Sequence, residues 1–269
     1  MSSSPIPANA LSNTSASESP SHLVLQMALR DVSVLFRTPW IIITRGLAFV
    51  IQVFVFAYFI STLIHIPGLN FWEYYSIGSV VTTIASISFV IGYDIFEEAE
   101  EGLLDYLLTL PVSRRQFIIG RALGGAIRAI IYTIPMFTVI VIFWGFNQPL
   151  SIASALLSMF LLAFGVTGMA ITLAVSVRTA NRFDVVIALL ELAVSRASIA
   201  LYPLQRLPDY VKGIAPFSPV SLASWNAWSS LAFSAPDLLN IAALGAFVAV
   251  FLGLGAAFYF RRLEGGIYA

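Results

Sequence analysis

Two ionisable residues lie in the middle of an apolar stretch of this 269-residue sequence. Glu191 and Arg196 are the only charged side chains between positions 185 and 205. A third charge, Arg128, borders a run without charged residues that extends to position 177. An unpaired charge inside a bilayer is costly, so such groups are commonly functional. They form structural ion pairs, face a water-filled cavity or contact a transported molecule, and the sequence leaves all three interpretations open.

Uncharged polar residues in two other apolar stretches offer hydroxyl and amide groups to the same environment. In a membrane helix such a group either lines a polar path or joins two helices by a hydrogen bond, which is the commoner role. The sequence does not distinguish the two roles. The residues are Gln52, Thr82, Thr83, Ser86 and Ser88.

The patterns that catalytic and metal sites require are missing from the sequence. It has no cysteine, its histidines His22 and His65 are far apart, and neither Gly-x-Ser-x-Gly nor His-Glu-x-x-His occurs. A Walker loop ends in Gly-Lys-Ser/Thr, whereas the single lysine, Lys212, is followed by Gly213. We therefore expect no catalytic residue, no metal site and no cofactor bound by this chain. Any ATP that drives it must bind to another protein.

Composition places these residues in a membrane. Hydrophobic residues make up 59% of the sequence and charged residues 10%, against roughly 25% charged in soluble domains. The formal net charge of zero gives no support for a nucleic-acid partner, so the lipid bilayer is the expected surrounding. A helix needs about 20 apolar residues to cross the hydrocarbon. We predict an all-α integral membrane protein with six transmembrane helices, at about 46–65, 74–95, 117–146, 150–177, 184–205 and 237–260.

Basic residues are unequally distributed between the two sides of these spans. Short cytoplasmic loops carry an excess of arginine and lysine. Only Arg206 and Lys212 fall on one side, which is therefore external, and both termini are expected in the cytoplasm. We predict a multi-pass protein of the cell membrane, with a disordered tail at 1–21 and a membrane domain at 22–269. The basic residues on the cytoplasmic side are Arg30, Arg37, Arg45, Arg114, Arg115, Arg121, Arg178, Arg182, Arg261 and Arg262.

A segment before the first span has the pattern of an amphipathic helix. Its apolar side chains recur at helical spacing, and arginines lie on the opposite face. Such a helix anchors the chain in the membrane surface, and the same surface can also contact a cytoplasmic partner. Both interpretations can hold together. The residues of this interfacial helix are Leu25, Leu29, Arg30, Val32, Phe36 and Arg37.

The cytoplasmic loop at 97–116, between the second and third spans, is polar but regularly patterned. Leucines share one face of a short helix that Pro111 ends, while Ser113 and Gln116 fit a capping box that starts the third span near Arg114. Its glutamates favour a helix N-terminus as solvated acids, but an exposed leucine ridge usually marks docking. We predict a docking helix with Glu97, Glu98, Glu100, Glu101, Gly102, Leu103, Leu104, Leu107, Leu110, Pro111 and Arg114.

The external segment between the last two spans is apolar but is interrupted by prolines. Ser218 and Pro219 fit the N-cap and the first position of a helix that extends to about Ser230. This helix is too short to span the membrane. We predict a short re-entrant or interfacial helix with Trp225 and Trp228 at the level of the lipid headgroups.

Over roughly residues 23–262 the arrangement resembles the permease subunit of the ATP-binding-cassette transporters, in the type-two exporter family of drug, polysaccharide and lipid-linked glycan exporters. The resemblance rests on the interfacial helix, on the run from Glu101 to Arg114, and on Phe117 to Arg121 (FIIGR) at the start of the third span. Ser218 and Pro219 stand where the family often has Asn-Pro, which is a small departure.

This resemblance implies partners and a function. It implies that the docking helix is a coupling helix that fits a groove on a separate nucleotide-binding ATPase subunit, which binds ATP and Mg²⁺. It further implies two permease copies with the substrate path between them, and short external helices before the last span. The chain is then the permease of an ATP-driven exporter and not an enzyme by itself. The alternative is a secondary transporter or channel that uses Glu191 and Arg196, although paired broken helices are not evident.

Overall fold

Helices make up most of the described chain. The computed structural model describes Leu25, Leu29 and Ser33, and residues 39–63, 68–101, 114–177 and 179–265. These residues contain no β-strand, in agreement with the predicted all-α class. The elements are α2 (Pro39–Ile51), η2 (Gln52–Ala57), α3 (Tyr58–Leu63), α4 (Phe71–Glu100), α6 (Arg114–Trp144), α7 (Pro149–Ser176), α8 (Ala180–Glu191), η3 (Leu192–Arg196), η4 (Leu204–Arg206), α9 (Asp209–Lys212), η5 (Ala215–Phe217), α10 (Pro219–Phe233) and α11 (Leu238–Gly265).

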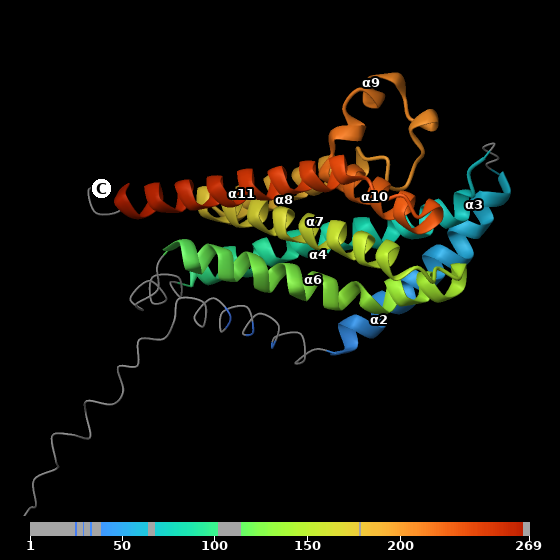
Figure 1. Ribbon diagram of the computed structural model, residues 1–269. Coiled ribbons are helices and arrows are strands. Elements are labelled where there is room, and N and C mark those ends of the chain that lie inside the picture. The colour runs from blue at the N-terminus through green and yellow to red at the C-terminus, as the bar shows by residue number, and fades with distance from the viewer. Residues whose placement is uncertain are drawn as a thin grey trace, which may run out of the picture.

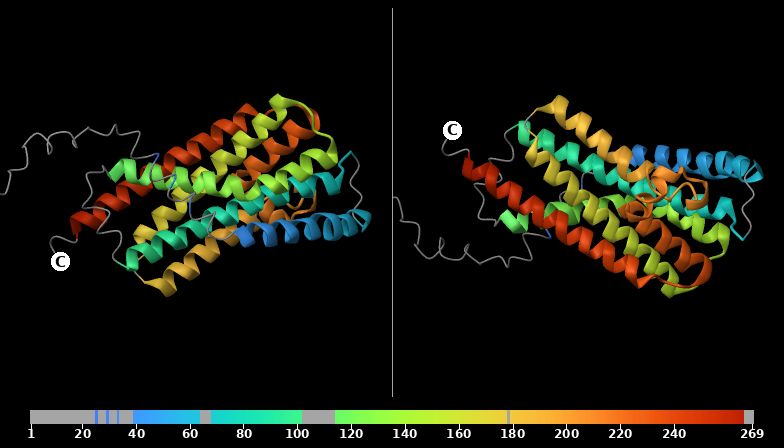
Figure 2. Two further views of the ribbon diagram at one scale, coloured as in Figure 1. Left: turned by 90° about the horizontal axis from the view of Figure 1, so that it is seen from below. Right: turned by 90° about the horizontal axis from the view of Figure 1, so that it is seen from above.

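Four long helices, α4, α6, α7 and α11, run along the length of the molecule (Figures 1 and 2). Helix α7 contacts the other three and α10. Small residues allow this close approach, since Gly165 of α7 faces the Phe247 ring of α11. The Thr172 hydroxyl of α7 also donates to the Phe251 carbonyl of α11 at 3.2 Å. In lipid, such packing and hydrogen bonds are the forces that join helices.

Five helical stretches have the length and composition needed to cross a membrane. They coincide with five of the six predicted spans, with ends that differ by a few residues. Helix α6 is described from Arg114 onward, and the predicted capping residue Ser113 lies outside the described residues. The five stretches are Gly46–Leu63, Phe71–Glu98, Ile118–Trp144, Pro149–Ser176 and Leu238–Phe258.

The predicted fifth span, 184–205, differs from the structure. Its helix begins earlier, at Ala180, and continues as the π-helix η3 to Arg196. The chain then bends, and the Ser198 hydroxyl donates to the Ser195 carbonyl at 2.6 Å beyond the end of the helix. The predicted helix is therefore too long at its C-terminal end.

The segment that starts with α8 packs antiparallel to α4. At one end the Phe183 ring stacks on the Phe96 ring, with centroids 4.3 Å apart. At the other end the Tyr74 hydroxyl donates to the Ile199 carbonyl. The part of α4 between these two contacts is about 33 Å long at 1.5 Å per residue. The segment therefore follows α4 over most of its length.

Helix α10 starts at Pro219, directly after Ser218, as predicted. It is buried against α4, α7 and α11, which favours the re-entrant over the interfacial alternative. The Asn226 amide donates to the Ser154 carbonyl of α7 at 3.3 Å, and its oxygen accepts the Asp237 backbone N–H at 2.8 Å. The turn that contains α9, which precedes α10, projects from the side of the bundle (Figure 1).

Several predicted features lie wholly or partly outside the described residues. Of the interfacial helix, Leu25 and Leu29 are helical and exposed, while its other members are not described. The tail at 1–21 is also outside. The remaining predicted site residues that fall outside are Arg30, Val32, Phe36, Arg37, Gly102, Leu103, Leu104, Leu107, Leu110 and Pro111.

Gly78 provides a test of the packing between α4 and the segment after η3. A Cβ atom at Gly78 would lie 1.7 Å from the Ala200 carbonyl oxygen, which is part of the backbone and must shift. We expect Gly78→Ala to lower the free energy of unfolding by about 1–3 kcal/mol, measured as thermal unfolding in detergent. Gly245→Ala is the matched control, because nothing lies within 4 Å of its added Cβ. Equal melting temperatures for the two variants would contradict this contact.

Candidate functional site

A polar cavity of about 430 Å³ opens between η2, α4 and the α8–η3 segment. It gathers most of the polar residues that the sequence singles out from separate spans. Ser88 is not among them, since it is buried and donates to the Ile84 carbonyl at 2.8 Å. The polar lining residues are Gln52, Thr82, Thr83, Ser86, Glu191, Ser195 and Arg196.

Two π-helical segments flank this cavity. Gln52 is the first residue of η2, and Ser195 and Arg196 end η3. A π-turn disturbs the regular pairing of backbone groups and is frequently found at functional sites. In η2 the Val53 carbonyl accepts the Trp72 indole N–H at 2.9 Å, and in η3 the Val194 carbonyl accepts the Ser218 hydroxyl at 2.7 Å. Side chains from other elements therefore hold both irregular segments in place.

Glu191 and Arg196 share the cavity but do not form an ion pair with each other. The Glu191 side chain is half-buried and Arg196 is exposed. Within the described residues, the ion pairs connect other groups. Of the interpretations that the sequence left open, the structural pair of Glu191 with Arg196 or Arg128 is therefore wrong. The interpretation that Glu191 and Arg196 face a cavity agrees with the structure.

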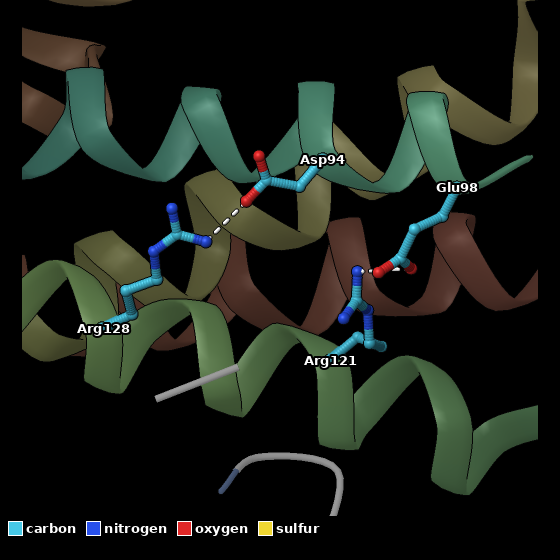
Figure 3. Close-up of polar contacts among 4 residues, drawn as sticks. All are labelled: Asp94, Glu98, Arg121 and Arg128. Atoms are coloured by element: carbon cyan, nitrogen blue, oxygen red, sulfur yellow. Dashed lines mark hydrogen bonds and ion pairs between the residues drawn. The ribbon is translucent and has the colours of Figure 1, made fainter. Parts of the chain in front are cut away.

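Arg128 instead pairs with Asp94, a residue that the sequence analysis did not consider. Its Nη1 lies 2.5 Å from the Asp94 Oδ2 (Figure 3). Closer to the helix ends, the Arg121 Nη2 lies 2.8 Å from the Glu98 Oε2. Asp94 and Glu98 are one turn apart on α4, and the arginines are two turns apart on α6. The signal in the sequence that could have suggested these pairs is the presence of two acids near the end of one predicted span and of two arginines near the start of the next.

The second ion pair also changes the description of the predicted docking segment. Glu98 turns toward α6, and its partner Arg121 is almost fully buried, with 4% of its side chain exposed. Glu97, Glu100 and Glu101 are exposed at the end of α4. Arg114 begins α6, so the loop between Glu101 and Arg114 connects two helices that the ion pairs join.

A bundle of long apolar helices that turns polar and charged groups toward a cavity is typical of membrane transport proteins. Residues 22–224 match the model of the family described as ABC-2 type transporter. Because the match covers more than half of the chain, this protein belongs to the ABC-2 type transporter family. It is a multi-pass membrane permease. A comparison with curated proteins gave no match.

A double-mutant cycle on Asp94 and Arg128 tests their pairing. We expect Arg128→Gln and Asp94→Asn each to lower the free energy of unfolding by about 1–2 kcal/mol, between the values for surface and buried pairs, since 39% of the Asp94 side chain is exposed. The double variant is expected to lose less than the sum, as measured by chemical unfolding in detergent. Lys212→Gln with Asp209→Asn, an exposed pair at 2.7 Å, is the control and is expected to show no coupling. Strict additivity at Asp94 and Arg128 would contradict the pairing.

Proposed function

We propose that this chain is the membrane-spanning subunit of an ATP-driven exporter, and that the polar cavity is part of its substrate path. The observation that carries this proposal is the polar lining itself, drawn from three separate helical segments inside an apolar bundle. Beside the cavity, Phe56 of η2 and Leu189 and Leu192 of α8–η3 are exposed apolar side chains. A second copy of the chain that covers this face places the path between the two copies.

Six membrane crossings are supported by the path of the α8–η3 segment. The stretch of α4 that this segment accompanies, about 33 Å, matches the hydrocarbon thickness of about 30 Å. Together with the five longer helices this gives an even number of crossings and both termini on one side. The distribution of basic residues makes that side the cytoplasm of a cell-membrane protein.

A separate ATPase subunit is the partner that this function requires, because the chain has no Walker loop for ATP and Mg²⁺. The loop between α4 and α6 is its docking site. Exposed glutamates precede this loop, and the Arg121–Glu98 pair joins the two helices from which it emerges. The interfacial helix supports the same contact from the membrane surface.

Cysteine labelling tests the topology, because the chain contains no cysteine of its own. Tyr210→Cys in α9 is expected to react with a membrane-impermeant maleimide on intact cells. Arg182→Cys at the start of α8 is expected to react only after permeabilisation. Both side chains are exposed, and the cysteine-free parent measures the background. Labelling of both positions from outside would contradict the sixth crossing.

Docking of an ATPase is tested by co-purification and hydrolysis. With a cognate ATPase subunit co-expressed, we expect Leu107→Asp to reduce the amount of ATPase recovered with the chain at least fivefold. The reason is that the new carboxylate would be buried in an apolar contact without a partner. Replacing Glu97, Glu100 and Glu101 by glutamine is expected to reduce stimulated hydrolysis while retaining part of the complex.

Ile214→Asp is the matched control for Leu107→Asp, because Ile214 is exposed and lies on the predicted external side. It is expected to leave the complex intact. Unchanged ATPase binding and hydrolysis in both docking variants would contradict this docking site.

The half-buried, unpaired Glu191 favours a second candidate function, an ion-coupled transporter. Gradient-driven flux through the chain alone in liposomes would support that function instead.

A further inference from the structure

Several neutral groups of the polar cavity offer hydrogen-bond acceptors. The hydroxyls of Thr82 and Thr83 both donate to the Ser79 carbonyl, at 3.0 and 2.7 Å. The Gln52 amide nitrogen donates to the Tyr75 hydroxyl at 3.1 Å. A hydroxyl has one hydrogen but two lone pairs, so the two threonine hydroxyls have used their donors and retain acceptor capacity. The Gln52 amide retains its oxygen and one N–H, and the buried Ser195 hydroxyl has no hydrogen-bond partner among the described residues. The cavity therefore offers acceptors to a ligand that carries donors.

Glu191 adds a negative charge to this acceptor-rich lining. An ionised carboxylate only accepts hydrogen bonds, and no basic residue in the described part of the chain forms an ion pair with it. A purely apolar ligand would bury this carboxylate without a partner, at a high cost. A divalent metal ion would have a single carboxylate ligand in this cavity. The described residues contain no group of three acidic or histidine side chains that could hold a metal ion. An ammonium group, with three donors and a positive charge, matches the lining.

Arg196 provides an opposite charge at the border of a second hollow. This hollow, of about 870 Å³, shares Leu192 and Arg196 with the polar cavity and is otherwise lined mainly by apolar side chains, including Leu189 and Tyr202. The guanidinium presents its donors in a fork that fits a carboxylate or a phosphate. Along this face, an acceptor-rich pocket, a cation and an apolar surface follow one another.

We propose that the cargo is a zwitterionic amphiphile, bound with its ammonium at Glu191, its phosphate or carboxylate at Arg196 and its hydrocarbon chain in the apolar hollow. The assignment as cargo rests on the proposed export function, whereas the binding site does not. Both charges of the head group meet an opposite charge, and the neutral hydroxyl and amide acceptors take the remaining ammonium hydrogens. A membrane lipid with an ethanolamine phosphate head group has this chemistry.

Native mass spectrometry of the full chain in detergent tests the site directly. The probes are two lipids with the same acyl chains, one with a phosphoethanolamine and one with a phosphoglycerol head group, which lacks the ammonium. We expect at least tenfold tighter binding of the phosphoethanolamine lipid, the ratio expected for a hydrogen bond to a charged group. Glu191→Gln is expected to abolish this preference.

Four further variants separate the role of the charges from effects on folding. Asp184→Asn and Arg182→Gln change exposed charges of α8 outside the cavity and are the matched controls for Glu191→Gln and Arg196→Gln. Arg196→Gln is expected to weaken the binding of both phospholipids about tenfold. Thr83→Val keeps the size and charge of the cavity and is expected to weaken phosphoethanolamine binding about threefold. Thr83→Val therefore still tests the binding site if the charge variants fail to fold.

Equal binding of the two lipids by the parent chain, or an unchanged preference in Glu191→Gln, would overturn the site. With the ATPase subunit assembled, stimulation of hydrolysis by the phosphoethanolamine lipid and not by the phosphoglycerol lipid supports its role as cargo, and binding without stimulation refutes that role. Failure of the proposed function has a different signature. In that case no ATPase associates with the chain, while the binding preference persists.

Discussion

Lipid offers no hydrogen-bond partner to a backbone group, so any irregular helix in the membrane must be completed by the protein itself. Two side chains do this here: Trp72 donates to the Val53 carbonyl in η2, and Ser218 donates to the Val194 carbonyl in η3. A π-turn adds one residue and rotates the rest of the helix by about 100° relative to a regular α-helix. These two hydrogen bonds complete the backbone of the segments that contribute Gln52, Ser195 and Arg196 to the cavity lining beside α4.

The membrane charges fall into two groups with different surroundings. Arg121 and Arg128 each have a carboxylate of α4 opposite, and these pairs join α4 to α6 (Figure 3). Glu191 and Arg196 occupy the cavity without an ion pair to each other or to other described residues. Because an isolated charge in lipid is costly, the second group requires either water or a ligand. This contrast supports the proposal that the cavity is part of the substrate path.

How much of this could be predicted from the sequence depends on the length over which each signal extends. Runs of about 20 apolar residues predict five spans well, and a local capping pattern predicts the start of α10 at Pro219. The π-helices have no such signal, because one inserted residue leaves hydropathy unchanged. Around the end of the helix at Arg196, Val194 and Ile199 form hydrogen bonds with Ser218 and Ser221, and the pairing of Arg128 depends on the relative rotation of α4 and α6. These are tertiary properties that a pattern along one segment does not contain.

Helix α4 connects the polar cavity to the ion pairs with α6. Thr82 and Thr83 line the cavity, and Asp94 and Glu98 pair with α6 farther along the same 30-residue helix. About 16 Å of continuous α-helix separates Thr83 from Asp94 at 1.5 Å per residue, a length over which a helix moves as a rigid element. In the proposed function the ATPase acts on the loop between α4 and α6. Since the ion pairs join these two helices close to that loop, a displacement there moves both together and changes the position of the cavity threonines relative to Glu191 on α8.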